Sequence, residues 1–418
     1  MVRSSVLDNG VRIVSEKMSE VRSVSLGIWV NVGSRNDPSR HLGIAHFTEH
    51  MLFKGTQRRS AIQIAREIDA LGGVLNAQTA KEYTVYYTKV IDEHLDKAAD
   101  ILFDLFLHSR VDTEELEKEK KVVLQEISMT EDTPDDFITD LFADAFFPDS
   151  PLGTSILGST ETVSEFRREH VFDFIDQFYR SESIVIAAVG NVEHERIVDV
   201  VSRCFGGRKS HCRTPEEATT PQRSGCTKVY YKDIEQVHIT LGTLGSAMND
   251  ERRWTYILLN TMLGGSMSSM LFQEAREKLG LVYSIYSYLS SYKDCGVLAM
   301  YAATTPDYIA KTLEVIGRQM KRVKNGDLKD ESIDDVKAQI KGNLLLSRES
   351  TVSRMSSLAK NEIYYNREVS VEEVLEKIQA VSLDQIIGLA NEIFVPERLT
   401  LVSLGKMEEQ GIKAIAIL

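Results

Sequence analysis

The 418-residue sequence contains few cysteines and few prolines. Its four cysteines are too few and too irregularly spaced to form the disulfide framework of a chain this long, so we expect reduced thiols. Only eight prolines interrupt the sequence, and 27% of the residues are charged and 43% hydrophobic, which indicates no large disordered or fibrous region. The length favours two globular domains over a single core.

Long apolar runs and an excess of positive charge are also missing. No segment reaches the roughly 20 apolar residues that a membrane-spanning helix needs, and residues 1–17 lack the continuous apolar stretch of a signal peptide. We therefore expect a cytoplasmic protein that makes no membrane contacts. Lysine and arginine total 49 against 62 aspartates and glutamates, which gives a net charge of -13 and argues against a nucleic-acid partner.

Two halves of the sequence resemble each other. The segment 184–190 is a continuous apolar run that ends in glycine and predicts a buried strand, and the segment 399–405 repeats it 215 positions later. A second pair agrees, because a strand followed by an amphipathic helix is predicted around Leu95 and again around Ile309, 214 positions later. The two matches together indicate a duplicated fold.

The segment 206–226 separates the two halves. It is rich in glycine, proline, serine, threonine and charge, and it has no hydrophobic period. We interpret it as a linker between an N-terminal domain at residues 1–205 and a C-terminal domain of the same fold at residues 227–418.

Each half mixes predicted strands with long predicted helices. In the first half, strands are expected at residues 11–16 and 24–32, and helices at residues 60–71 and 114–129. Such a mixture predicts an α+β domain with helices on one face of the sheet.

The segment 43–55 contains two histidines and a glutamate in the order His-x-x-Glu-His. If the segment is helical, His46, Glu49 and His50 share one face, because positions i, i+3 and i+4 line up. Two neutral imidazoles leave a bound zinc ion with an open position for water, and a carboxylate beside that water can take its proton. The pattern is the inverted counterpart of the His-Glu-x-x-His zinc helix. The alternative is a helix that carries two histidines by coincidence.

A catalytic zinc ion generally has three protein ligands, so a third ligand must come from elsewhere. The best candidate is Glu126, because the predicted helix that carries it begins charged and becomes apolar at Val122. A carboxylate at the point where a helix enters the core needs a partner. Glu119 lies two turns earlier on the same face and could support a ligand or the water. Its alternative role is that of an ordinary solvent-exposed glutamate.

With this constellation, the sequence resembles the pitrilysin and insulinase family of zinc peptidases over nearly its full length. It is similar above all to the branch that contains the β subunit of the mitochondrial processing peptidase. The segment 46–56 follows the family pattern throughout. In that family a glutamate ligand follows the last motif histidine by about 76 residues, which falls on Glu126, and a supporting glutamate falls on Glu119. The resemblance implies a zinc metalloendopeptidase that binds one Zn2+ per chain.

Two further segments match the family. Asn76 and Ala77 match an edge strand that holds the substrate backbone, and Arg276 and Tyr283 match a pair from the C-terminal half that completes the active site. Edge strands do bind peptides through main-chain hydrogen bonds, and a cation with a phenol suits a developing oxyanion. Without the resemblance, either segment could equally be ordinary structure.

The resemblance also implies an architecture and partners. Each half would be a mixed, mostly antiparallel sheet backed by helices, and the two halves would form one arm of a clamshell that encloses extended peptides. Residues 1–205 would be the zinc-binding catalytic domain, because the second half has no second His-x-x-Glu-His. We expect a homodimer, and a heterodimer with an inactive homologue stays open. The alternative function is that of a non-catalytic assembly subunit of the same fold.

Overall fold

The computed structural model describes residues 2–208, 225–328 and 332–407. The chain forms two compact units, and each of them contains one segment from the other half of the sequence. The first unit comprises Met1–Met129, Thr154–Glu217 and Leu345–Glu368, and the second comprises Thr130–Gly153, Ala218–Leu344 and Val369–Leu418. A division of the sequence at residues 206–226 therefore does not coincide with the packing units. Most of that predicted linker, residues 209–224, lies outside the described residues.

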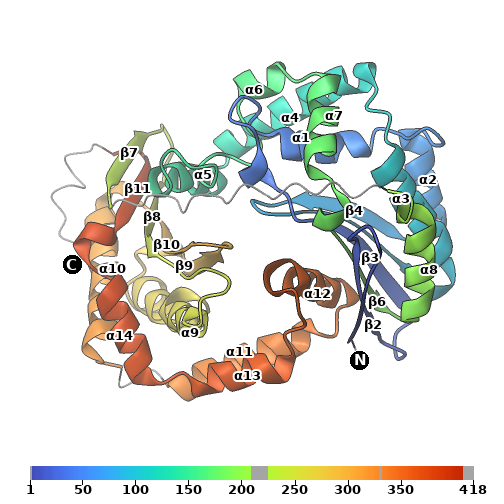
Figure 1. The fold of residues 1–418 in the computed structure, drawn as a ribbon. Coiled ribbons are helices and arrows are strands. Elements are labelled where there is room, and N and C mark those ends of the chain that lie inside the picture. The colour runs from blue at the N-terminus through green and yellow to red at the C-terminus, as the bar shows by residue number, and fades with distance from the viewer. Residues whose placement is uncertain (1, 209–224, 329–331, 408–418) are drawn as a thin grey trace. The chain divides into compact units, whose positions relative to one another are not determined.

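The first unit is built on a six-stranded sheet with the order β1-β2-β6-β3-β5-β4 (Figure 1). β2 and β6 are parallel, and all other neighbours are antiparallel. The strands are β1 Val2–Val6, β2 Arg12–Lys17, β3 Ser23–Val30, β4 Val74–Thr79, β5 Thr84–Ile91 and β6 Ile184–Gly190. β4 lies at the edge of this sheet, as the sequence predicted.

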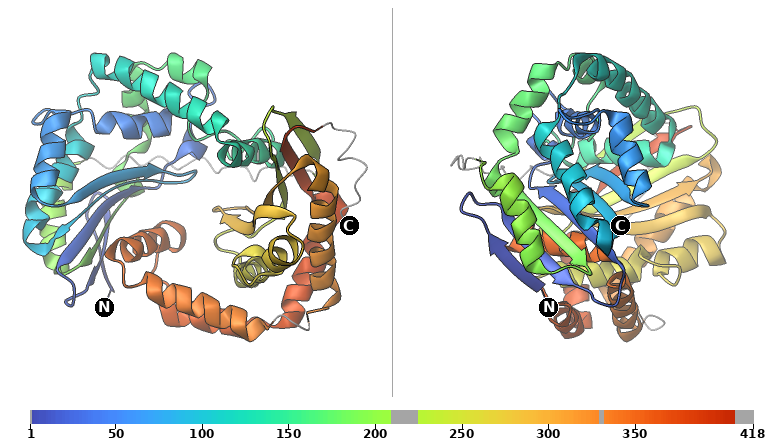
Figure 2. Two further views of the ribbon diagram at one scale, coloured as in Figure 1. Left: turned by 180° about the vertical axis from the view of Figure 1, so that it is seen from behind. Right: turned by 90° about the vertical axis from the view of Figure 1, so that its right-hand side faces the viewer.

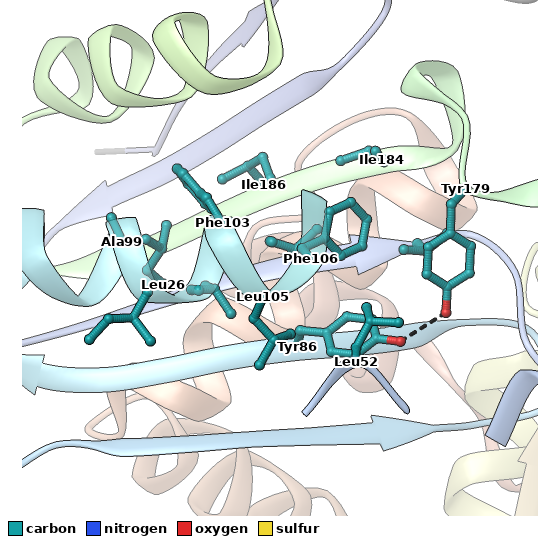
Figure 3. Packing of buried hydrophobic residues seen from close by; sticks show 14 of the residues in the cluster. Leu26, Leu52, Tyr86, Ala99, Phe103, Leu105, Phe106, Tyr179, Ile184 and Ile186 are labelled. Carbon is teal, nitrogen blue, oxygen red and sulfur yellow. Dashed lines mark hydrogen bonds between the residues drawn. The ribbon is translucent and has the colours of Figure 1, made fainter. Parts of the chain in front are cut away.

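Both faces of the central strands of this sheet are buried. Side chains alternate between the two faces of a strand, so a strand that is covered on both sides is apolar at every position. In β6, Ile184 and Ile186 enter the larger core with Tyr86 and Phe106 (Figure 3), whereas Val185 packs on the opposite face. This explains the continuous apolar run from which the strand was predicted.

Different parts of the sequence cover the two faces. The opposite face is covered by α12, Thr351–Tyr365, which buries Met355, Leu358 and Ala359 against the sheet (Figure 2). The sequence predicted helices on one face only. The remaining helices of the first unit are α1 Ile44–Leu52, α2 Ala61–Ala70, α3 Leu95–His108, α4 Thr113–Asp132, α6 Thr160–Ser164, α7 Arg168–Phe178 and α8 His194–Phe205.

The second unit contains a five-stranded sheet with the order β7-β11-β8-β10-β9. Only β7 and β11 are parallel. The strands are β7 Thr227–Tyr231, β8 Val237–Leu244, β9 Val282–Ser291, β10 Gly296–Thr304 and β11 Thr400–Gly405. The helices are α5 Pro134–Phe146, α9 Arg253–Gly264, α10 Ile309–Asn325, α11 Ile333–Ser347, α13 Val371–Ala380 and α14 Leu383–Ile393, with a π-helical turn at Phe272–Lys278.

Here too a helix from the other half of the sequence covers one face of the sheet. Phe142 and Phe146 of α5 pack on that face with Val402 and Leu404 of β11. The approach is close, because a Cβ atom on Gly242 of β8 would lie 2.2 Å from Cζ of Phe142. Glycine at this point therefore lets the Phe142 ring lie directly against the strand, and a larger residue would displace the ring.

The two sheets share one topology, which confirms the predicted duplication. In each, one strand pairs in parallel with a neighbour on one side and antiparallel on the other: β6 lies between β2 and β3, and β11 lies between β7 and β8. The α+β class with two homologous mixed sheets is thereby confirmed. Within the described parts of the chain, no helix combines the length and the apolar character that crossing a membrane requires.

Candidate metal centre

The helix α1 carries the His-x-x-Glu-His segment, and its N-terminus is held firmly. It begins after Gly43, whose φ of +90° favours glycine and whose Cβ, if present, would lie 2.5 Å from the carbonyl oxygen of Leu157. The Asp37 carboxylate accepts hydrogen bonds from the N–H groups of Gly43 (2.7 Å) and Ala45 (3.1 Å). These bonds satisfy donors that a helix N-terminus leaves free.

His46, His50 and Glu126 come together, as the sequence predicted. Nε2 of His50 lies 3.1 Å from Nε2 of His46, and Oε2 of Glu126 lies 3.6 Å from the former and 3.9 Å from the latter. One possible ligand atom from each residue lies within 4.8 Å of the others. A tetrahedral zinc site with bonds of about 2.0–2.1 Å has edges of about 3.3–3.4 Å. The spacing of these three atoms therefore suits a zinc ion.

The chemistry of these three side chains also fits a cation. Oε2 of Glu126 is buried without a hydrogen-bond partner, which is costly for a carboxylate oxygen and would be relieved by a metal ion. Burial, and then the neighbouring His50, lower the pKa of His46 to about 3, so its imidazole is neutral and able to bind a metal.

His50 differs from His46 because carboxylates surround it. Burial lowers the pKa of His50, but the hydrogen bond to Glu119 and the charge of Glu126 outweigh burial, and the pKa is raised. Oε1 of Glu119 lies 2.8 Å from Nδ1 of His50, which leaves Nε2 free to face the other ligand atoms. Such a carboxylate fixes the orientation of a ligand histidine and increases its basicity.

Glu119 has a second partner that the sequence analysis missed. Nζ of Lys54 lies 2.5 Å from Oε2 of Glu119, whose side chain is 5% exposed. Burial raises the pKa of Glu119, but the hydrogen bonds to His50 and Lys54 outweigh it, and the pKa lies below its usual value. His50 and Lys54 together thus favour the ionised form of the buried carboxylate. Lys54 lies four residues after His50, just past the end of α1, and this spacing could have identified it as a neighbour of the site.

Glu49 faces a different neighbour. Its Oε2 accepts a hydrogen bond from Oγ1 of Thr79 at 2.5 Å. Burial raises the pKa of Glu49 above its usual value, which makes its carboxylate a better proton acceptor. The nearby backbone N–H of Thr79 also lowers the pKa of this carboxyl group, but less than the hydroxyl does. The sequence analysis missed Thr79, although it lies only two residues after Ala77.

Asn76 and Ala77 lie on the edge strand β4. The side chain of Asn76 is exposed and that of Ala77 is half-buried. Oδ1 of Asn76 accepts a hydrogen bond from the N–H of Ala77 at 2.8 Å. The predicted strand position is confirmed, and substrate binding by these residues stays a prediction.

Arg276 and Tyr283 belong to the second unit, in the π-helical turn and in β9. The structure brings the two side chains together, with Cζ of Arg276 5.0 Å from the centroid of the Tyr283 ring. Tyr283 is 77% exposed, so its hydroxyl is accessible from solvent. The catalytic role of the pair stays a prediction.

Comparisons with known proteins identify the family. The profile described as Insulinase (Peptidase family M16) matches residues 12–160, and the profile described as Peptidase M16 inactive domain matches residues 165–340. The chain is 41% identical to the uncharacterized zinc protease YmxG of Bacillus subtilis (strain 168), over 96% of this chain and 98% of that protein. The chain belongs to peptidase family M16. This confirms the predicted family, and the narrower branch stays a prediction.

Further relatives and solved structures are similar to this chain over nearly its full length. An uncharacterized zinc protease of Streptomyces coelicolor is 38% identical over 98% of this chain and 90% of its own length. Among solved structures, a protease from Helicobacter pylori matches with a TM-score of 0.90 at 22% identity, over 97% of this chain and 99% of that one. A peptidase M16 inactive domain from Pseudomonas fluorescens matches with a TM-score of 0.88 at 20% identity, over 97% and 98%. These two structures support the M16 fold.

Proposed function

We propose that the chain is a zinc-dependent endopeptidase that hydrolyses peptides held in an extended conformation. The convergence of His46, His50 and Glu126, with the Glu49 carboxylate on the same helix face as the histidines, carries this proposal. The names of the relatives, which describe zinc proteases, support it. The proposal includes one zinc ion per chain.

In this proposal the polar residues of the site, from α1 and α4, have three tasks. His46, His50 and Glu126 hold the zinc ion, which when bound supplies a Lewis acid that polarises the peptide carbonyl and acidifies water. Glu49 accepts the proton of the attacking water and then donates it to the leaving amine. Glu119 keeps His50 oriented through Nδ1.

The peptide would pair with the edge strand β4 near Asn76 and Ala77, because main-chain hydrogen bonds bind extended segments of many sequences. Arg276 and Tyr283 would stabilise the negative charge that develops on the carbonyl oxygen. Their guanidinium and phenol groups have the donors for this task.

Cleavage of a peptide library, analysed by mass spectrometry, tests the proposal. We expect internal cleavage that disappears after treatment with a chelator and returns when Zn2+ is added. Metal analysis of the same samples should give one zinc ion per chain. A folded protein that binds no zinc and cleaves no peptide would instead support the non-catalytic subunit, and cleavage that survives complete removal of metal would contradict a metallopeptidase.

We propose further that the active form is a homodimer in which Arg276 and Tyr283 of one chain serve the metal site of the other. A mixture of Glu49→Gln and Tyr283→Phe chains tests this. Random pairing makes about half of the dimers hybrids with one intact site each, so co-expression should restore roughly a quarter of the wild-type activity. If the pair acts within its own chain, every site carries a defect, and confirmed hybrids stay as inactive as either parent.

A further inference from the structure

Thr79 connects two features of the first unit that the proposed function uses separately. It is the last residue of β4, and among the described residues its Oγ1 supplies the hydrogen bond that the Glu49 carboxylate accepts, at 2.5 Å. Glu49 lies on α1, which packs against β4. The carboxylate of the proposed proton acceptor is therefore hydrogen-bonded to the last residue of β4, the strand that is proposed to bind the substrate.

The hydroxyl contact is short and charge-assisted. A hydroxyl that donates to a carboxylate forms a stronger hydrogen bond than a pair of neutral groups does. Oγ1 of Thr79, at 2.5 Å, therefore holds the Glu49 carboxylate in one place. Without the hydroxyl, the carboxylate would gain freedom to rotate.

The outer edge of β4 shows where a peptide would meet this arrangement. N–H groups of a strand point alternately to its two sides. The N–H of Ala80 donates to Tyr83 across the β4–β5 turn, whereas the N–H of Thr79 lies on the side of the Glu49 carboxylate and the N–H of Ala77 donates to Oδ1 of Asn76. Ala77 thus presents the next outward donor, about 7 Å along the strand from that of Thr79.

Oδ1 of Asn76 occupies this donor at 2.8 Å and stands in for the carbonyl oxygen of a bound peptide. A peptide that displaced Asn76 and paired with Ala77 would then run along the edge toward Glu49. Its position relative to the proton acceptor would be set by the short, fixed distance between Ala77 and Thr79 in one strand.

We propose that Thr79 is a positioning residue that holds Glu49 in register with the peptide paired on β4. This inference rests on the proposed peptidase function. Thr79 forms no bond with the reacting atoms. Its effect should appear in turnover, because it aligns the base, and not in zinc binding or peptide binding.

Replacement of Thr79 by valine removes the hydroxyl while keeping a β-branched side chain of similar shape. We expect kcat to fall by about 10- to 100-fold, since small misplacements of a catalytic group cost this much, with KM within about twofold. Thr79→Ser keeps the hydroxyl and should recover most of kcat. If the valine variant is poorly folded, Thr79→Ala takes its place, judged against the same serine variant.

Thr84→Val is the matched control. Thr84 lies directly opposite Thr79 in the β4–β5 register, is fully buried, and donates its hydroxyl to the carbonyl oxygen of Val32 at 2.9 Å. The Thr84→Val variant loses a buried hydroxyl at the same end of the hairpin and leaves the hydrogen bond between Thr79 and Glu49 in place. We expect its thermal stability to fall while its kcat stays close to that of the wild type.

Three measurements separate positioning from general damage. Zinc content and the affinity for a fluorescein-labelled library peptide, measured in the inert Glu49→Gln background, should be unchanged by Thr79→Val. In that background the valine substitution should also cause no further loss of residual turnover, because interacting residues are not additive. A wild-type kcat in folded, zinc-loaded Thr79→Val would overturn the inference and leave the peptidase function standing, as would equal losses in the valine and serine variants. A wild-type protein that cleaves nothing would remove both.

Discussion

The two sheets share a strand order, yet only the first carries metal-ligating side chains. In each unit a helix follows the strand that pairs antiparallel with β6 or with β11: α1 follows β3, and α9 follows β8. α1 places two histidines and a glutamate along its length, whereas α9 buries Leu258, Leu259, Met262 and Leu263. Across the described residues, the one group of three or more possible ligands is that of the first unit. A fold thus supports a function only where particular residues are added to it.

The comparison also shows what those residues require. The helix α9 buries mainly apolar side chains, whereas α1 brings titratable side chains into the core, and these need partners. Glu119 and Lys54 serve His50, and Thr79 serves Glu49. These partners come from α4, the end of α1 and β4, so the metal site depends on several elements being correctly packed.

Glu49→Gln, which changes the proposed base in the first unit, should have the largest effect on peptide cleavage. The amide still hydrogen-bonds to water but cannot accept its proton, so turnover should fall by at least about 10²- to 10⁴-fold. Zinc content and the unfolding temperature should stay near those of the wild type. Measured peptide cleavage above a tenth of the wild-type rate would show that another residue is the base.

Removal of a ligand should act on the metal itself. His46→Ala, His50→Ala and Glu126→Ala should each lower zinc occupancy strongly, and Glu119→Ala should weaken it less, by roughly 10- to 100-fold. Glu117→Ala is the matched control, because Glu117 lies on the same helix, is 60% exposed and pairs with Lys120 at 2.8 Å. Zinc titration against a competing chelator gives the affinities. Full zinc occupancy in Glu126→Ala would place the third ligand elsewhere.

Lys54→Met should have a smaller effect on the same measurement. The loss of the ammonium leaves Glu119 with less compensation for its burial, so its carboxylate holds His50 less well. We expect zinc affinity to fall, but by less than the roughly 10- to 100-fold expected for Glu119→Ala. Lys54→Arg, which keeps the charge, should retain part of the zinc affinity that Lys54→Met loses. Equal affinities in Lys54→Met and the wild type would assign Lys54 a merely structural contact.

The features predicted from the sequence are those that depend on local pattern. The apolar runs of β6 and β11 and the helix α1 follow from the burial of neighbouring residues. Glu126 was found because a helix changes from charged to apolar around it, and the family resemblance then supported the same residue. These are short-range properties that a sequence displays directly.

The features that were missed depend on long-range packing. The positions of α5 and α12 could not be predicted. An amphipathic pattern indicates that one face of a helix is buried, but not which sheet that face packs against. Lys54 and Thr79 were missed because lysine and threonine are ordinary on a helix end and in a strand. Only the fold shows that their side chains reach Glu119 and Glu49.

The smallest expected effect concerns a buried histidine of the second unit. His238 on β8 lies against the hydroxyl of Tyr301, with Nδ1 at 2.8 Å, and has no metal-binding partners of the kind that surround His50 within the described residues. Burial lowers the pKa of His238 from the usual 6.5, and the charge of Asp135 offsets this only in part. The folded state therefore binds fewer protons here than the unfolded state does at acidic pH.

The sign of the pH dependence follows from this difference. The stability that neutral His238 contributes is present above pH 6.5 and is lost as the pH falls from there through the lower pKa of the folded state. Urea unfolding at about pH 7.5 and about pH 5.5 should show a decrease in the free energy of unfolding that is smaller in His238→Gln, since glutamine does not titrate. Other histidines titrate in both proteins, so only the difference between them is diagnostic. If the variant loses as much stability on acidification as the wild type, His238 keeps its usual pKa in the folded chain despite its burial.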